Sequence, residues 1–417
     1  MHENVKTEIV KISAVEILDS RANPTVSCEV KLASGARGRA EVPSGASTGK
    51  YEAHEKRDGG ARFGGRGVQN VCEKIETELS RALCGKDAAN QKLIDGLLIR
   101  ADGAPDKSNF GANALLAVSL ASARASACAY GLPLYRYLGG VYGSRLPVPM
   151  MNVINGGAHA ANNLEIQEFM LVPTGAKSYA DGVRACAEIY AHIGALLRKK
   201  GLSTAVGDEG GFAPSLESDE EAVTLLCEAI EAAGYGTDKV KIALDVAASS
   251  WACEAGYRLP KSGELLSAGK LTEKLRMLAE KYPIISIEDP VGEDDEEAWQ
   301  SVTATLGKKL MLVGDDLFVT DAHRIAELSE KGCANSALIK PNQCGTLSET
   351  VAAVQFAKKA GYKTIISHRS GDTADTFIAD LAVAVNADFI KAGAPARGER
   401  VAKYNRLLEI EKEICFM

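Results

Sequence analysis

The sequence lacks paired cysteines, long apolar runs and an excess of positive charge. Its ten cysteines are scattered singly through 417 residues with no Cys-x-x-Cys pair, which favours reduced thiols over a disulfide framework or a zinc site. The net charge of −7 argues against a nucleic-acid-binding surface or a patch for anionic membranes. No apolar stretch is expected to reach the roughly 18 residues of a membrane span, and the N-terminal MHENVKTEIVKISAVEI lacks the apolar region of a signal peptide. We therefore expect a cytoplasmic protein with no membrane segment and no requirement for nucleic acid.

The length and the order of local patterns predict two domains. A chain of 417 residues exceeds one ordinary domain and accommodates a barrel with a smaller companion. Strand-like alternation at 5–18 and 25–32 is followed by helical periodicity across 69–137, an order typical of an α+β unit. Glycines at 139 and 140 interrupt the pattern. We expect an α+β N-terminal domain at 1–138 and a second domain at 139–417.

The second domain repeats a short apolar run that stops on a charged or titratable side chain. After a first step of 43 residues, the terminal residues lie 27, 25, 28 and 23 apart, about one strand, one helix and two loops each. Buried parallel strands read as continuous apolar runs, and barrel enzymes place their chemistry at the carboxyl ends of the strands. The pattern predicts a mostly parallel β/α barrel whose mouth carries Asp245, Glu288, Asp315, Lys340, His368 and Lys391.

Three acids at one mouth indicate a metal site. Carboxylates repel one another unless a cation lies among them, and oxygen-only ligands favour a hard ion such as Mg²⁺. The alternative is that each acid caps a helix or pairs with a surface lysine. For Lys340 and Lys391, burial lowers the pKa toward that of a general base, whereas nearby acids raise it. The sequence leaves this balance open, together with purely structural pairing of the lysines.

Three further segments suit an anionic substrate. Residues 367–371 (SHRSG) combine an arginine with hydroxyls and a glycine, which is a good cradle for phosphate or carboxylate. Residues 43–49 (PSGASTG) resemble a phosphate loop but lack the G-x-x-x-x-G-K-[ST] spacing, and their small residues and hydroxyls also suit a mobile lid. Residues 207–212 (GDEGGF) bracket two acids with glycines, although this segment could be a plain turn. An anion, a metal, a lysine base and a separate acid together indicate β-elimination of water.

Long strings spread over the whole chain resemble the enolase family. They occur in one order at 19–21 (DSR), 23–26 (NPTV), 43–49 (PSGASTG), 207–214 (GDEGGFAP), 243–249 (ALDVAAS), 286–290 (SIEDP), 337–343 (ALIKPNQ), 367–371 (SHRSG) and 393–400 (GAPARGER). The resemblance implies an irregular (β/α)8 TIM-type barrel behind a smaller α+β domain, assembled as a dimer or a dimer-built octamer. It also implies reversible dehydration of 2-phospho-D-glycerate to phosphoenolpyruvate in glycolysis and gluconeogenesis.

The resemblance assigns roles to individual residues. Lys340 would remove the proton at C2, and Glu209 would assist loss of the C3 hydroxyl. His159 would lie close by on a mobile loop, and Glu168 would support the acid. The substrate-binding set would be Gln167, His368, Arg369, Ser370 and Lys391. Two Mg²⁺ ions are implied, the second arriving with substrate, and their ligands would be Asp245, Glu288, Asp315 and Ser47.

The sequence departs from the family pattern at several places outside these assignments. Ala22 stands where glycine is usual, which puts the local turn in question, and Ala158 stands where serine is common before His159. Residues 57–66 and 250–252 also differ from the usual strings. Two other functions stay open: a related enzyme that acts on another carboxylate substrate, and a binding or scaffold protein that has kept the fold without turnover.

Overall fold

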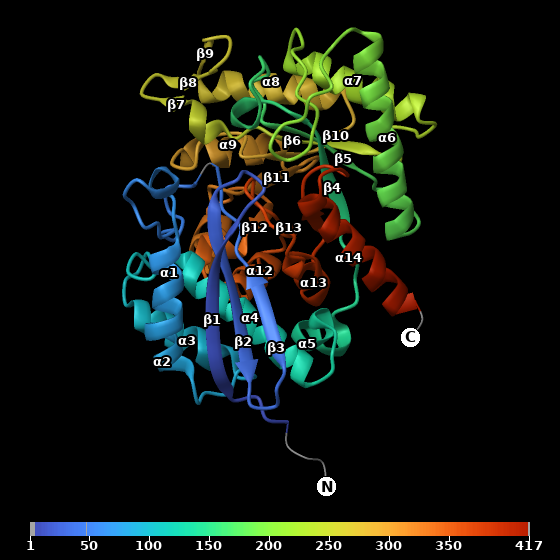
Figure 1. The fold of residues 1–417 in the computed structure, drawn as a ribbon. Helices are drawn as coiled ribbons and strands as arrows, with labels where there is room; N and C mark the ends of the chain where they lie inside the picture. The colour runs from blue at the N-terminus through green and yellow to red at the C-terminus, as the bar shows by residue number, and fades with distance from the viewer. Residues whose placement is uncertain (1–4, 47, 416–417) are drawn as a thin grey trace.

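The computed structural model describes residues 5–46 and 48–415 and has two parts (Figure 1). An antiparallel sheet with helices forms the N-terminal part, and a closed barrel surrounded by helices follows it. The predicted fold class, a TIM-type barrel behind a smaller α+β unit, is confirmed. All ten cysteines are free, in agreement with the expected reduced thiols.

The N-terminal sheet pairs β1 (Ile9–Leu18), β2 (Pro24–Leu32) and β3 (Arg37–Glu41) in the order β1-β2-β3. Helix α4 packs across β2 and β3. A Cβ added at Gly38 would lie 2.1 Å from the Ala125 nitrogen, so this close approach requires glycine. The other helices of this part are α1 (Gln69–Lys74), α2 (Ser80–Leu83), α3 (Gln91–Asp102) and α5 (Leu134–Gly139).

Helix α4 (Ala112–Ala129) corrects the expectation about long apolar runs. Its 18 residues have a mean hydropathy of 1.2, enough by length and composition to cross a membrane. Alanine and serine dominate the helix, so the run did not stand out as strongly apolar, and 83% of it is buried inside the protein. This burial is typical of the core helix of a globular protein.

Eight strands close the barrel in the order β10-β11-β12-β13-β14-β4-β5-β6. All neighbouring pairs are parallel except β4–β5 and β5–β6, so β5 alone runs against the others. The prediction of a mostly parallel barrel holds, with this one reversal. The strands are β4 (Val148–Asn155), β5 (Glu168–Val172), β6 (Lys241–Asp245), β10 (Ile284–Glu288), β11 (Met311–Gly314), β12 (Ser336–Ile339), β13 (Lys363–Ser367) and β14 (Phe389–Lys391).

The reversal of β5 has a local cause and a consequence for the site. The segment between β4 and β5 contains one short helical turn (Gly157–His159) but no crossover helix that could return the chain to the other end. The first residue of β5, Glu168, therefore lies at the same end of the barrel as the last residues of the parallel strands. Glu168 is paired in register with Asp245, which is paired with Glu288.

Capped helices and a small hairpin sheet surround the barrel (Figure 1). Serine, threonine or aspartate side chains accept backbone N–H bonds at the starts of six of these helices, which satisfies donors that the helix cannot pair. The elements are α6 (Tyr179–Lys199), α7 (Asp219–Ala232), α8 (Ala268–Lys281), α9 (Glu296–Leu306), α10 (Ala322–Glu330), α11 (Pro341–Cys344), α12 (Leu347–Lys359), α13 (Phe377–Ala384), α14 (Gly398–Cys415), β7 (Ala252–Cys253), β8 (Gly256–Arg258) and β9 (Leu265–Leu266).

A compact apolar cluster fills the barrel interior. It comprises Met150, Met170, Val172, Ala243, Val313, Leu338 and Ile365, all nearly inaccessible to solvent. Several of these residues precede a predicted mouth residue by two positions. Because side chains alternate across a strand, residues two apart share a face, so the apolar cluster lies directly below the mouth.

Candidate active site

The six predicted strand-end residues all lie where a barrel strand ends. Asp245, Glu288 and Lys391 are the last residues of their strands. Asp315, Lys340 and His368 directly follow β11, β12 and β13. The structure therefore brings the predicted ring together at one mouth, as the spacing indicated.

Lys391 is the centre of one half of this ring. Its Nζ lies 2.9 Å from Asp245 Oδ2, 2.7 Å from Glu288 Oε2 and 3.3 Å from Glu168 Oε1. All four side chains are buried, so each charge depends on this pairing. Gln167 Nε2 also reaches Asp245 Oδ2, at 3.4 Å, which places the predicted substrate-binding amide in the same cluster.

Asp315 and Lys340 form the other half. The Lys340 ammonium donates a short hydrogen bond to Asp315 Oδ2, and Gln343 Nε2 donates to Asp315 Oδ1 at 2.9 Å. Thr320 Oγ1 in turn donates to Gln343 Oε1 at 2.6 Å, which fixes the orientation of the amide. Gln343 belongs to the ALIKPNQ string but has no role in the sequence assignment.

For both lysines, nearby acids raise the pKa by more than burial lowers it, which decides the balance that the sequence left open. Burial lowers the pKa of Lys340 and Asp315 raises it, with a net increase above the ordinary value. At Lys391, burial is again opposed by Asp245 and Glu168, and the pKa is raised strongly. Both lysines are therefore ammonium ions in this arrangement of the site.

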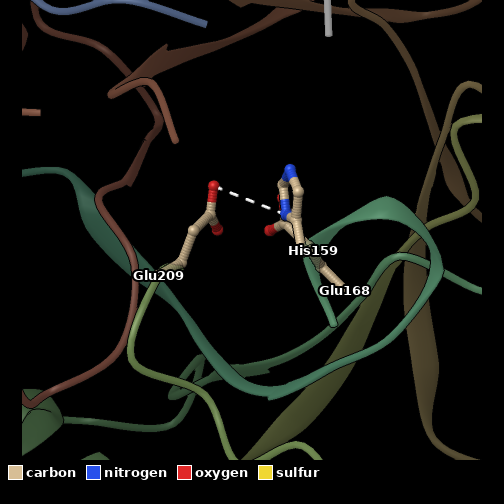
Figure 2. Close-up of side chains that lie close together, drawn as sticks. All are labelled: His159, Glu168 and Glu209. Atoms are coloured by element: carbon tan, nitrogen blue, oxygen red, sulfur yellow. Dashed lines mark ion pairs between the residues drawn. The ribbon is translucent and has the colours of Figure 1, made fainter. Parts of the chain in front are cut away.

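Glu209, His159 and Glu168 form a second cluster beside the ring (Figure 2). One ligand atom from each lies within 4.8 Å of the others. His159 Nδ1 is 3.6 Å from Glu168 Oε1 and 3.7 Å from Glu209 Oε1. The structure thus brings the proposed acid Glu209 together with the two residues that the resemblance placed near it, although the three come from different segments of the chain.

Glycines allow the Glu209 segment to approach the barrel closely. A Cβ at Gly207 would lie 2.7 Å from the His159 carbonyl oxygen, and Gly210 has a φ of +88°, which favours glycine. Asn152 on β4 donates to Glu209 Oε2 at 3.0 Å. Asn152 was missed because the 150–154 segment was treated as a uniform apolar run, although a polar amide inside a buried strand is a signal that could have identified it.

Burial and neighbouring groups shift the pKa values of Glu168 and Glu209 in opposite directions. Burial, followed by the charge of Glu209, raises the pKa of Glu168 well above its usual range. Burial also raises the pKa of Glu209, but the combined lowering by groups such as His368 and His159 is larger. The net pKa of Glu209 therefore lies well below the usual range. A proton shared by the pair therefore resides on Glu168 in this arrangement.

His368 has a defined tautomer. Its Nδ1 lies 2.7 Å from Arg400 Nη1, and a guanidinium can only donate, so Nδ1 is the acceptor. Burial lowers the pKa of His368 to about 4, so the neutral ring carries its proton on Nε2, 3.5 Å from Glu209 Oε1. His368 therefore turns the Nε2 edge of its ring toward Glu209, although this nitrogen forms no hydrogen bond within the described residues.

Arg400 is fully buried and organises the 367–371 segment. It donates to the carbonyl oxygens of Arg369 and Ser370 at 2.7 and 2.6 Å. Its charge is distributed over backbone carbonyls rather than engaged in one close ion pair. Arg400 received no role in the sequence analysis, because arginine side chains are usually solvated.

The predicted anion cradle faces the 43–55 segment of the N-terminal part. Ser370 Oγ accepts from the Ala46 nitrogen at 2.7 Å. The two Nη groups of Arg369 contact the Glu52 carboxylate at 2.8 and 3.2 Å. Arg369 and Ser370 thus lie together, and Ser47, the remaining predicted metal ligand, falls outside the described residues.

The donor set at the mouth fits a divalent cation. Asp245, Glu288 and Asp315 offer only oxygen, and Glu288 Oε1 has no hydrogen-bond partner within the described part of the chain. The Lys391 ammonium between Asp245 and Glu288 shows that these carboxylates accept a positive charge there. Within residues 5–46 and 48–415, the tightest groups of three potential ligands are different ones: His159, Glu168 and Glu209, and Asp289, Asp315 and Asp316.

Comparison with protein families covers nearly the whole chain. The enolase N-terminal domain matches residues 9–138, and the enolase C-terminal TIM barrel domain matches residues 143–416. Both matches agree with the observed sheet and barrel. This family consists of lyases that act on small-molecule substrates with divalent metal ions. The chain therefore belongs to the enolase family.

Proposed function

We propose that the protein catalyses the Mg²⁺-dependent, reversible dehydration of 2-phospho-D-glycerate to phosphoenolpyruvate and water, in glycolysis and gluconeogenesis. The observation that carries this proposal is the composition of one buried mouth. Carboxylates from three neighbouring strands meet two lysines, and an arginine beside a serine lies next to them. This combination suits a substrate that carries both a carboxylate and a phosphate.

Asp245, Glu288 and Asp315 would hold the first Mg²⁺, and Ser47 would help to hold a second that arrives with substrate. Bound Mg²⁺ stabilises the negative charge that develops on the substrate carboxylate when the C2 proton leaves. A lysine or histidine base with Mg²⁺ is the arrangement found in enolase-superfamily sites.

Lys340 is proposed as the base at C2. It must be neutral to accept a proton, whereas Asp315 now favours its ammonium form. Lys340 would have to lose this proton before acting as the base, and Asp315, as one of the residues that would hold the ion, would then stabilise the ammonium less. The Asp315–Lys340 contact is thus expected to loosen when the site is loaded.

Glu209 is proposed as the acid that assists loss of the C3 hydroxyl, with Glu168 and His159 beside it. In the described arrangement Glu168 holds the proton more strongly than Glu209 does. Glu209 must therefore receive a proton before it acts, and Glu168 is its nearest carboxyl neighbour in this cluster. Replacement of either residue by glutamine is expected to slow dehydration.

The remaining site residues are proposed to orient the substrate. Arg369 and Ser370 would bind the phosphate through charge-assisted hydrogen bonds. Gln167, His368 and Lys391 would contact the rest of the substrate. Lys391 is already an ammonium ion, so it would act as a fixed positive charge rather than as a base.

The direct test is formation of phosphoenolpyruvate, followed as rising ultraviolet absorbance with 2-phosphoglycerate and Mg²⁺. Product should form with Mg²⁺ and stop when EDTA is added in excess. Absence of product at every Mg²⁺ concentration would reject the proposal, and a panel of other carboxylate substrates would then separate a related activity from a scaffold without turnover.

The remaining expectations also belong to this proposal. We propose a cytoplasmic homo-oligomer, either a dimer or a dimer-built octamer, with no nucleic-acid partner. We further propose a domain division at residues 1–138 and 139–417. Light scattering of the purified protein measures the oligomeric state, and limited proteolysis near residue 139 tests the domain boundary.

A further inference from the structure

Glu52 places a carboxylate on the arginine that the proposed function assigns to the substrate phosphate. Its two oxygens lie 2.8 and 3.2 Å from the Nη atoms of Arg369. The side chains are 7% and 3% exposed, so the pair is shielded from solvent. The charge of Glu52 raises the pKa of Arg369 against the effect of burial, which is consistent with a close pair.

Glu52 is held in place by groups other than Arg369. Its Oε1 accepts from the Gly49 nitrogen at 3.0 Å and from Gln343 Nε2 at 3.3 Å. The backbone nitrogen of Ala53 donates to the carbonyl oxygen of Gln343 at 2.8 Å. The carboxylate therefore has a fixed position and is not a surface side chain that happens to face an arginine.

We propose that Glu52 is a positioning residue that acts as an internal anion on Arg369, lowering the affinity of the site for phosphate so that substrate and product are exchanged readily. This inference rests on the proposed function, because it requires that Arg369 binds the phosphate. It adds a residue to the site that comes from the N-terminal part and that opposes substrate binding.

Coulomb's law determines the sign of the effect. A carboxylate beside the guanidinium neutralises much of its charge and repels a phosphate dianion that approaches the same group. Removal of the negative charge should therefore strengthen phosphate binding. A carboxylate that served only to hold Arg369 in shape would have the opposite effect, because its loss would disorder the guanidinium and weaken binding.

Glu52 also connects phosphate binding with the N-terminal segment around it. Residues on either side of it contact the barrel: the Ala46 nitrogen donates to Ser370 Oγ, and the backbones of Ser44 and Gly371 exchange two hydrogen bonds. A phosphate that displaces the Glu52 carboxylate from Arg369 would disturb the Gly49 contact as well. The anion and this segment are thus expected to respond together.

The experiment is a calorimetric titration of the Mg²⁺-loaded protein with inorganic phosphate. Glu52→Gln should lower the phosphate Kd by at least about threefold. Glu52→Asp keeps the charge but withdraws it from Arg369, so its Kd should fall by less. Glu73→Gln is the control: it removes the same charge at an exposed site of the N-terminal part, and its phosphate Kd should stay within about twofold of wild type.

An unchanged or higher phosphate Kd in Glu52→Gln would overturn the inference, and a higher Kd in Glu52→Asp would do so even if the glutamine variant failed to fold. Arg369→Met distinguishes this failure from failure of the proposed function. If that variant binds phosphate as tightly as wild type, then Arg369 is not the phosphate ligand and both proposals fail. If phosphate binding depends on Arg369 but Glu52→Gln does not strengthen it, only the role of Glu52 is rejected.

Discussion

Two layers of the same barrel differ by a single two-residue step along the strands. In β6, Ala243 lies in the apolar interior and Asp245 lies at the mouth. Leu338 and Lys340 repeat the same step at the end of β12. Apart from Lys340, whose side chain is 13% exposed, the residues in the upper layer are nearly as inaccessible as those below. The two layers therefore differ in chemistry more than in exposure.

The difference shows what stabilises each layer. Apolar side chains gain free energy from leaving water and from close packing. Buried charges lose the free energy of hydration, and only attraction to partner groups offsets this loss. A buried ion pair is therefore weak evidence for stability. The upper layer is therefore best explained by function, and the lower one by folding. The following experiments test this contrast, beginning with the largest expected effect.

Lys340→Ala should remove function in a variant that still folds, although stability should also fall because Asp315 loses its ammonium partner. We expect kcat to fall by at least about 10²-fold, since a positioned general base contributes about 10²–10⁴-fold. The measurement is phosphoenolpyruvate formation at saturating substrate and Mg²⁺, with thermal unfolding measured in parallel. A folded variant with unchanged turnover would show that another group is the base.

Lys391→Met tests how far the charged layer depends on pairing. It leaves the buried Asp245 and Glu288 without the ammonium that they share, so the free energy of unfolding should fall by about 3–5 kcal/mol in denaturant titrations with EDTA present. Lys308→Met at an exposed site is the control, with an expected change within about 0.5 kcal/mol. Equal stability of the two variants would show that Lys391 does not stabilise the buried carboxylates around it.

Leu338→Ala is the matching change in the apolar layer. The residue is fully buried, so the cavity should cost about 2–5 kcal/mol of unfolding free energy. Leu338→Met keeps the volume and should cost less than about 1.5 kcal/mol. If Leu338→Ala reduced kcat as much as Lys340→Ala while remaining folded, the division between the two layers would fail.

His368 links the charged layer to pH. Its pKa in the folded protein is about 4, below the ordinary value of about 6.5. As pH falls through this interval, the unfolded chain binds a proton that the folded protein does not, so stability should decrease by about 1.4 kcal/mol per pH unit. No contribution from this group is expected above the ordinary pKa.

The control for this prediction is His368→Gln, which removes the titration and retains an amide near Glu209. Glu209, Asp372 and Arg400 face the imidazole and titrate or stay charged in both proteins. Denaturant unfolding at pH 7, 6 and 5 should therefore give a flatter profile for the variant than for wild type. Parallel profiles would mean that His368 is protonated equally in folded and unfolded chains.

Ala22 provides a small reference effect outside both layers. Its φ of +57° lies in the left-handed region, which costs an alanine about 1–2 kcal/mol. Ala22→Gly should stabilise the protein by about 1 kcal/mol or less, since glycine loses more entropy on folding. Thermal unfolding measures this, and Ala33→Gly, where φ is not positive, should not stabilise. Turnover is expected to stay the same.

Much of the barrel and half of its site could be predicted from the sequence. The regular spacing of apolar runs located the strand ends, including Asp245, Lys340 and Lys391, because the period of a strand and helix repeats along the chain. The same pattern could not locate Glu168 or Gln167, since β5 runs in the opposite direction and presents its first residues to the mouth. Only the family resemblance supplied these two residues.

Neither the strand periodicity nor the family resemblance assigned a role to Glu52, Asn152 or Arg400. Each acts on a residue far away in the sequence: Glu52 on Arg369, Asn152 on Glu209 and Arg400 on His368. A contact of this kind depends on how the N-terminal segment, the barrel and α14 pack against one another. Local patterns record periodicity and charge but not which distant surfaces meet.

The sequence by itself determined the two-part architecture, the strand ends and the kinds of chemical group at the mouth, because these follow from short-range periodicity and composition. Tertiary structure decided which charges face one another. It raised the pKa of Lys340 and Lys391, moved the pKa values of Glu168 and Glu209 in opposite directions and set Glu52 against Arg369. These are properties of distance and burial, since the energy of a buried charge depends on partners that only the closed barrel brings within a few ångströms.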